Sequence, residues 1–145
     1  CTNQFVGTLG DFDVSVDLSS IASPAGRFYY ELSCSIALVQ YERRDDNNLY
    51  YNIDYLGGAA LDEAVGSPIT STTFRISRIS GITKVYIGGV LKYTSTVNNT
   101  NINNFKYIVG VEDTGDTASA SLDNFVLEDG ASKVLRIDYE GDSCT

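Results

Sequence analysis

Residues 72–96 have the sequence TTFRISRISGITKVYIGGVLKYTST, and this stretch decides the fold class. Its first part alternates apolar Phe74 and Ile76 with polar neighbours, which is the period-two pattern of a half-buried β-strand. Farther along, Gly88 and Gly89 separate KVYI from VLKY, and a glycine pair supplies the positive φ angles of a type I′ hairpin turn. The stretch therefore predicts antiparallel strands joined by tight turns.

The same alternation recurs along most of the chain. Residues 11–18 (DFDVSVDL), 105–111 (FKYIVGV) and 132–140 (SKVLRIDYE) place apolar side chains on one face and polar ones on the other. Turn-forming segments such as RRDDNN at 43–48 separate these runs, and only LDEAVG at 61–66 suggests a single helical turn. About ten short strands with turns between them predict an all-β sandwich or barrel.

Composition and charge exclude several classes of function. With 19 acidic and 10 basic residues the chain has a net charge of −9, which disfavours binding to the phosphates of nucleic acid. The absence of His excludes a Ser-His-Asp or Cys-His nucleophile system. No apolar run approaches the roughly 18–20 residues of a membrane span, so we expect no membrane insertion. Residues 1–145 are expected to form a single β-sandwich domain with a sizeable core.

The chain has three cysteines, so at least one thiol lies outside an intrachain pair. Cys34 stands in the apolar run YYELSCSIALV, where we expect a buried thiol. Cys1 and Cys144 stand near the two ends, each before a Thr, and the termini of a domain are often close together. We therefore predict a disulfide between Cys1 and Cys144, which would stabilise the fold by ~5 kcal/mol.

From about Gly10 to Gly130 the order of three motifs resembles the concanavalin A-like lectin/glucanase superfamily, which includes the laminin G-like modules. GDFDVSVDL is similar to an early strand of that family, residues 72–96 to its unit of strand, glycine turn and hairpin, and SASLDNFVLEDG to its closing strand. The resemblance implies a two-sheet antiparallel jelly-roll sandwich. The Glu-x-Asp-x-x-Glu strand of laminarinase-type relatives and the His of alginate-lyase-type relatives are absent, so we expect no enzyme.

The segment VLRIDYEGDS at 134–143 is similar to the opening strand of such modules. Since only CTNQFVGTL precedes GDFDV, the chain starts about one strand short, and we expect the C-terminal strand in the place of the family's opening strand. Three arrangements are open: the tail fills the gap in its own chain, it is donated to the next subunit, or the chain is one unit of a tandem array. An unfilled sheet edge is a template for pairing, so donation would assemble filaments.

The resemblance also implies a calcium ion where the opening and closing strands meet. Asp123 matches the aspartate of the closing strand, and Asp138, Glu140 and Asp142 share one face of the terminal strand. Calcium takes about 6–8 oxygen ligands, which carboxylates and backbone carbonyls supply. The alternative is a solvated acidic strand face.

Sugar sites combine aromatic faces with Asn, Asp and Arg side chains, and this chain has ten tyrosines. The candidate ligand-binding residues are Tyr41, Arg43, Tyr51, Asn52 and Asp54. Against them stand the absence of Trp and the preference of Tyr for half-buried strand positions. Asn98 begins the sequon NNT, which makes it a candidate glycosylation site.

Two hypotheses follow for a non-catalytic extracellular or cell-surface module. The first is a structural or adhesive unit that partners itself, assembling into filaments or arrays through its terminal strand or tandem linkage. The alternative is a lectin-like module that binds glycans, with or without calcium. The displaced strand and the terminal cysteines favour the first hypothesis, and the functions common in the family that the chain resembles favour the second.

Overall fold

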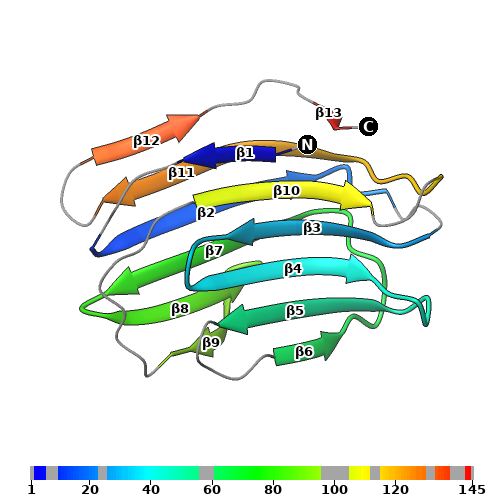
Figure 1. Cartoon of the computed structure of the whole chain (residues 1–145), viewed down its shortest axis with the longest axis horizontal. Helices are drawn as coiled ribbons and strands as arrows, with labels where there is room; N and C mark the ends of the chain where they lie inside the picture. The colour runs from blue at the N-terminus through cyan, green and yellow to red at the C-terminus, as the bar shows by residue number, and fades with distance from the viewer. Residues whose placement is uncertain are drawn as a thin grey trace.

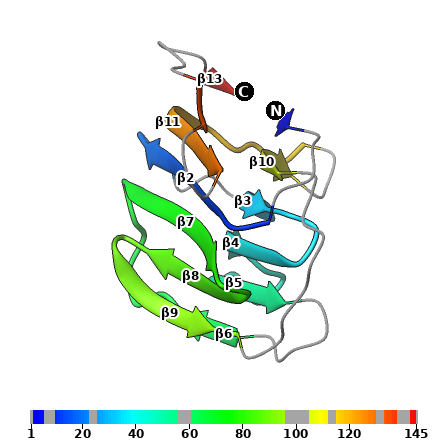
Figure 2. The same cartoon turned by 90° about the vertical axis from the view of Figure 1, so that its left-hand side faces the viewer.

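The structure of the chain, a computed structural model, is an antiparallel sandwich of two stacked sheets (Figure 1, Figure 2). It describes residues 2–5, 10–22, 26–55, 61–95, 105–111, 115–129, 133–137 and 143–144. Across these residues the chain has no helix, and so none long and apolar enough to cross a membrane. The predicted all-β jelly-roll architecture is confirmed.

The first sheet has six strands in the order β1-β10-β3-β4-β5-β6, and every neighbouring pair is antiparallel. These strands are β1 (Thr2–Phe5), β10 (Phe105–Val111), β3 (Phe28–Ser33), β4 (Ala37–Arg43), β5 (Leu49–Tyr55) and β6 (Leu61–Ala64). Cys34 lies in the turn between β3 and β4, where its N–H donates to the carbonyl of Ala37 at 2.8 Å. The run YYELSCSIALV is therefore a hairpin and not one strand.

The second sheet has seven strands in the order β12-β11-β2-β7-β8-β9, with β13 also paired to β11. These strands are β12 (Lys133–Ile137), β11 (Ala120–Asp129), β2 (Phe12–Ser19), β7 (Thr72–Ile79), β8 (Ile82–Ile87), β9 (Val90–Thr94) and β13 (Ser143–Cys144). Between β8 and β9, Gly88 and Gly89 have φ angles of 56° and 78°, as a type I′ turn requires. The predicted hairpin is confirmed.

The C-terminal segment pairs within its own chain. β12 runs antiparallel to β11, with Leu127 opposite Leu135, and β13 continues along β11 with Ala120 opposite Cys144. β12 thus occupies one edge of the second sheet, while β1 occupies one edge of the first. The correspondence of β12 to the family's opening strand stays a prediction, as does donation of the strand to another subunit.

The alternation of apolar residues builds the core between the two sheets. The inward apolar residues of β2 and β7 are at most 3% exposed: Phe12, Val14, Val16, Leu18, Phe74 and Ile76. The two layers meet in aromatic contacts such as Phe12 against Phe105, whose ring centroids are 4.8 Å apart. Burying each such side chain contributes roughly 1.5–3 kcal/mol. Val111 departs from the pattern and is 40% exposed, because it is the last residue of β10.

The segment LDEAVG does not form the helical turn that its sequence suggested. Leu61–Ala64 form strand β6, which pairs with β5 and places Asp62 opposite Asn52. A single isolated helical turn is costly to nucleate, whereas a strand here completes hydrogen bonds with an existing sheet. Glu63 accepts two hydrogen bonds from Lys92 of β9, at 2.8 and 2.9 Å, and so links the two sheets at this edge.

Candidate functional site

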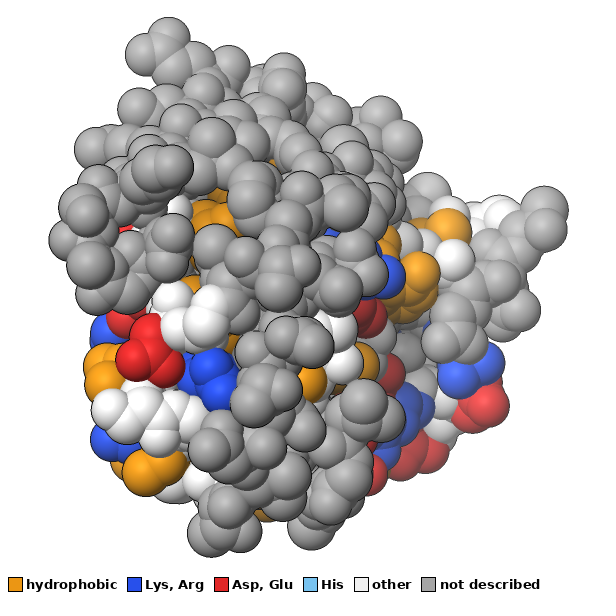
Figure 3. All heavy atoms as spheres, turned by 60° about the vertical axis from the view of Figure 1, so that its left-hand side comes forward, with side chains coloured by type: hydrophobic (Ala, Val, Ile, Leu, Met, Phe, Trp, Pro, Cys, Tyr) orange, Lys and Arg blue, Asp and Glu red, His pale blue; other side chains and the backbone are white. Residues whose placement is uncertain are grey.

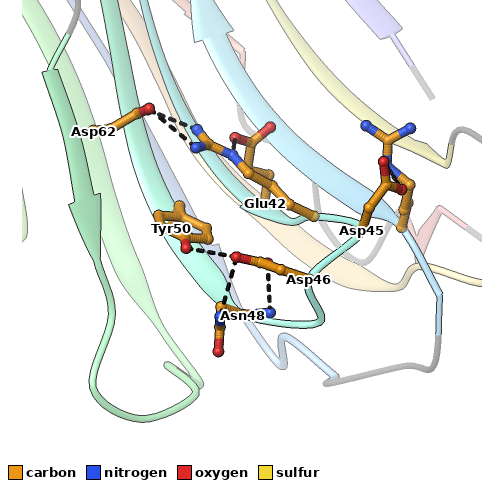
Figure 4. A network of polar contacts seen from close by, with 8 residues as sticks. Glu42, Asp45, Asp46, Asn48, Tyr50 and Asp62 are labelled. Carbon is orange, nitrogen blue, oxygen red and sulfur yellow. Dashed lines mark hydrogen bonds and ion pairs between the residues drawn. The ribbon is translucent and has the colours of Figure 1, made fainter.

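A polar cluster lies on the outer face of the six-stranded sheet, over β4, β5 and β6 (Figure 4). It consists of Glu42, Arg44, Tyr50 and Asp62, and we call it the Arg44 cluster. Glu42 stands opposite Tyr50 in the sheet, and both project from the face that the core does not use. Because side chains alternate between the faces of a strand, even-numbered residues of β4, β5 and β6 share this outer face.

Arg44 follows β4 directly and is held at three of its nitrogens. Its Nη1 and Nη2 donate to the carboxylate of Asp62 at 3.0 and 2.6 Å, and its Nε donates to Glu42. Its guanidinium carbon lies 4.2 Å from the centre of the Tyr50 ring. The hydrogen bonds to Asp62 raise the pKa of Arg44, and Arg44 in turn lowers the pKa of Asp62. Arg44 is therefore a charged group fixed in one position.

The turn between β4 and β5 holds the tyrosine of this cluster. Asp46 accepts hydrogen bonds from the N–H of Asn48 at 2.9 Å, from the Asn48 side chain at 3.1 Å and from the Tyr50 hydroxyl at 2.7 Å, as the dashed lines in Figure 4 show. These bonds, the Asn48 N–H first, lower the pKa of Asp46. The same contact with Asp46 raises the pKa of Tyr50. The turn thus anchors the ring over which Arg44 lies.

Asn52 stands beside the cluster with unused hydrogen-bonding capacity. It lies between Gln40 of β4 and Asp62 of β6 in the register of the sheet. Its Oδ1 is shielded from solvent and has no hydrogen-bond partner in the described part of the chain. A shielded acceptor without a donor costs about 1–3 kcal/mol. Asn52 therefore holds an acceptor that the described residues leave unsatisfied, next to the Arg44 cluster.

The structure divides the five predicted ligand-binding residues between two sides of the sheet. Asn52 and Asp54 lie on the outer face, and Asp54 is exposed. Tyr41 is fully buried, and Tyr51 packs partly buried against the core. The guanidinium of Arg43 lies 5.7 Å from the centre of a core ring of β3. As a correction to the prediction, Tyr41, Tyr51 and Arg43 belong to the inner side, because odd-numbered residues of these strands point inward.

None of the five candidate ligand-binding residues chosen from the sequence belongs to the Arg44 cluster. A signal was present in YERR at 41–44, where Glu42 and Arg44 are two residues apart and so share a face of the strand. The same rule joins Tyr50 to Asn52 in β5. What the sequence did not show was which of the two faces of β4 and β5 the core covers.

The other predicted sites lie mostly outside the described part of the chain: Cys1, Asn98, Asp138, Glu140 and Asp142. Asp123 is described; it is exposed, and its Oδ1 accepts the N–H of Asn124 at 2.7 Å. Among the described residues no group of three or more His, Cys, Asp or Glu is placed to hold a metal ion. Cys34 is a free thiol whose pKa is raised by burial. The calcium site, the disulfide and the glycosylation site stay predictions.

Charges of opposite sign are interleaved on the surface. Figure 3 shows acidic and basic side chains lying next to one another on the face that it displays. The ion pairs between described residues include that of Arg27 with Asp45, at 3.0 Å. Among the side chains described on that face, no area is purely basic.

Comparison with known proteins identifies the fold and leaves the family open. No protein-family model and no curated protein matches the sequence. A tetrameric galectin from the ball sponge Cinachyrella sp. aligns with a TM-score of 0.51 and 16% identity, over 88% of this chain and 98% of the galectin. The carbohydrate-binding module CBM66 from Bacillus subtilis aligns with a TM-score of 0.50 and 13% identity, over 88% of this chain and 81% of the module.

A third solved structure is the CBM2 module of the evolved Dit protein of Lactobacillus casei BL23 phage J-1. It aligns with a TM-score of 0.54 and 12% identity, over 83% of this chain and 65% of that chain. Identities this low establish the shared fold alone. The chain therefore resembles the concanavalin A-like lectin/glucanase superfamily in its jelly-roll sandwich, as its motifs predicted.

Proposed function

We propose that this chain is a non-catalytic carbohydrate-binding module, and that the outer face of β4, β5 and β6 binds the sugar. The observation that carries the proposal is the Arg44 cluster beside Asn52. Sugar hydroxyls both donate and accept hydrogen bonds, so they pair well with a group of fixed carboxylates, a guanidinium and an amide. Further support comes from two proteins that share the sandwich, the sponge galectin and the Bacillus module.

The charge of the cluster favours a neutral sugar. Glu42 and Asp62 outnumber Arg44, and the whole chain has a net charge of −9. An anionic sugar would approach carboxylates whose only cation is already paired with them, and like charges at such distances repel. We therefore expect the ligand to be uncharged.

The hypothesis of a self-assembling structural or adhesive unit receives no comparable support. One of its two mechanisms, strand donation, requires a terminal strand that another subunit accepts, and β12 is already paired with β11 of its own chain. The other mechanism, tandem linkage, stays a prediction. The sponge galectin is a tetramer, and self-association of this chain stays a separate prediction. An extracellular or cell-surface location, where a module of this kind meets glycans, belongs to the proposal.

A glycan array with matched variants tests the proposal. The purified chain is expected to retain neutral glycans, and Asn52→Leu should reduce their apparent affinity by about tenfold or more, because it removes the amide at nearly constant volume. Thr94→Val is the control, since it is another isosteric change from polar to apolar at an exposed position of the opposite sheet. Retention of no glycan, or equal binding by Asn52→Leu, would contradict the proposal.

Calcium support is a separate proposal that depends on Asp123 and the acidic residues of the tail. A melting scan with excess Ca²⁺ and with a chelator tests it, because a ligand that binds only the folded state raises the melting temperature. The expected result is a higher melting temperature with Ca²⁺. Identical curves would remove the calcium site and leave the sugar site in place.

A further inference from the structure

A shallow hollow of about 250 Å³ lies on the opposite side of the molecule, on the outer face of the seven-stranded sheet. It is lined by Asp13, Ser15, Arg75, Val126 and Glu128, and we call it the Arg75 hollow. Its residues come from β2, β7 and β11, which are neighbours in the second sheet. None of them belongs to the Arg44 cluster.

The register of the three strands creates the hollow. Ser15 of β2 stands opposite Arg75 of β7 on one side and opposite Val126 of β11 on the other. A serine between two larger side chains leaves a depression at the centre of the face. The register of β11 against β2 also shifts just before Val126, where Asn124 has a φ of 49°. Such bulges re-aim the side chains beside them.

Arg75 is fixed at the wall of the hollow. Its Nε donates to Asp13 at 2.7 Å and its Nη2 donates to the other oxygen of the same carboxylate. Its guanidinium carbon lies 4.9 Å from the centre of the Tyr86 ring. The hydrogen bonds to Asp13 raise the pKa of Arg75, so the group stays charged. A donor held by a carboxylate and a ring needs little ordering when a ligand arrives.

The hollow has unused donors and acceptors. Within the described part of the chain, no hydrogen bond engages the Nη1 of Arg75, the hydroxyl of Ser15 or the carboxylate of Glu128. Val126 supplies an apolar wall. Two carboxylates and one guanidinium give the lining a net charge of −1, which adds to the negative charge of the chain. The lining therefore suits a ligand that donates and accepts hydrogen bonds and carries no negative charge.

We propose that the Arg75 hollow is a second binding site, which takes a single neutral sugar residue. Its volume is below the roughly 300–1,000 Å³ of pockets for drug-sized ligands, so it has room for one small ring. A ring hydroxyl accepts from Arg75, another donates to Glu128, and the C–H face packs on Val126. This assignment goes beyond the proposed function, since it stands on a different face with different residues.

Two sites on opposite faces make a single domain bivalent. The six-stranded and seven-stranded sheets turn their outer faces away from each other, so one sugar residue cannot occupy both sites (Figure 2). A monomer would therefore bridge two glycan chains. On a surface with many glycans, the second contact would form at a high effective concentration and strengthen weak individual binding.

Amide chemical-shift mapping of the ¹⁵N-labelled chain tests the second site. The probes are D-glucose, D-galactose, D-mannose and N-acetyl-D-glucosamine, with D-glucuronate and ethanolamine as charged counterparts. We expect at least one neutral sugar to cause saturable shifts at Ser15, Arg75 and Val126. Ser15→Phe fills the hollow and should weaken this binding by about tenfold or more, and Glu128→Gln should weaken it too. Ser19→Phe is the matched control, because Ser19 is an exposed residue of the same strand and face.

The outcomes separate this inference from the proposed function. Shifts at Ser15 that disappear in Ser15→Phe, persist in Ser19→Phe and survive Asn52→Leu support the second site. The inference is overturned if no neutral sugar gives saturable shifts there, if Ser15→Phe binds as the unmodified chain does, or if glucuronate or ethanolamine binds as well as any sugar. Shifts confined to β4, β5 and β6 would overturn it while supporting the proposed function. The amide spectrum of each variant also shows that the variant is folded.

Discussion

Each outer face of the sandwich carries an arginine that lies over a tyrosine ring, but the two arginines differ in their hydrogen-bond partners. On the six-stranded sheet Arg44 lies over Tyr50 at 4.2 Å, and on the seven-stranded sheet Arg75 lies over Tyr86 at 4.9 Å. Each arginine donates hydrogen bonds from two guanidinium nitrogens to the carboxylate of one aspartate. Arg44 also binds Glu42, whereas the Nη1 of Arg75 has no partner among the described residues. The side chains are 26% and 44% exposed, respectively.

The difference shows what fixes a charged group on a β-sheet. Around Arg44 the aspartate stands on an edge strand, and the turn at Asp46 holds the tyrosine from a second direction. Around Arg75 both partners stand on central strands, and no turn contributes. The first face is therefore rigid with a spare amide at Asn52, and the second is open with a spare guanidinium nitrogen.

The largest expected effect comes from the core that both faces share. Phe74 is fully buried in β7, and its ring centroid lies 6.4 Å from that of Tyr51 in the opposite sheet. Phe74→Ala should lower the free energy of unfolding by about 3–5 kcal/mol, because it leaves a cavity between the sheets. Urea denaturation measures this. Val90→Ala, at a position 58% exposed, is the control and should change stability by less than about 0.5 kcal/mol. Equal effects would contradict the assigned core.

A glycine on the first face gives the next largest effect. A Cβ at Gly110 would clash with the ring of Tyr29, which stands opposite it in β3. Gly110→Ala should therefore displace that ring and cost about 1–3 kcal/mol. Gly66→Ala is the matched control, because a Cβ there meets nothing within 4 Å. If both variants have the same stability, the Tyr29 ring does not lie over β10.

The stability that Asp62 contributes on the first face should depend on pH. Arg44 lowers the pKa of Asp62 below its unfolded value of about 3.9, so Asp62 contributes stability above that pH and loses it as the pH falls through the folded pKa. Since Asp62 is 55% exposed, the contribution should stay below about 1 kcal/mol. The stability difference between the unmodified chain and Asp62→Asn, measured by denaturation from pH 6 to 2 (about the range in which carboxylates titrate), should shrink toward acid. A difference that does not change with pH would show that Asp62 does not pair with Arg44.

The smallest expected effect compares the two tyrosines. The hydroxyl of Tyr50 donates to Asp46, whereas no hydrogen bond of the Tyr86 hydroxyl is found among the described residues. Tyr50→Phe should therefore lower the melting temperature slightly, and Tyr86→Phe should leave it unchanged. Calorimetry of both variants measures this. A larger loss of melting temperature in Tyr86→Phe than in Tyr50→Phe would contradict the hydrogen bond between Tyr50 and Asp46.

The sequence predicted the fold because the buried strands alternate cleanly. In β2 every apolar residue is inward and every intervening residue is polar, so the inner face was visible from DFDVSVDL alone. The hairpin at Gly88 and Gly89 was equally visible, because positive φ angles at two successive residues call for glycine.

The candidate site was less predictable, for physical reasons. LYYNIDY carries aromatic residues on both faces of β5, and Tyr tolerates either a buried or a wet position, so the pattern does not say which face is inside. Arg43 and Arg44 are adjacent in sequence and so point to opposite sides of the sheet. Arg43 lies over a core ring, and Arg44 forms the outer cluster. Asp62 was missed because the edge strand β6 forms only against β5, and local sequence does not encode that contact.

The most direct test of the account is a crystal structure of the chain with a neutral oligosaccharide retained from the array. We expect a sugar ring over β4, β5 and β6, with a hydroxyl within about 2.7–3.2 Å of the Asn52 amide. We expect Arg44 and Asp62 to remain paired beneath it. An oligosaccharide that makes no contact with the outer face of β4, β5 and β6 would contradict the account.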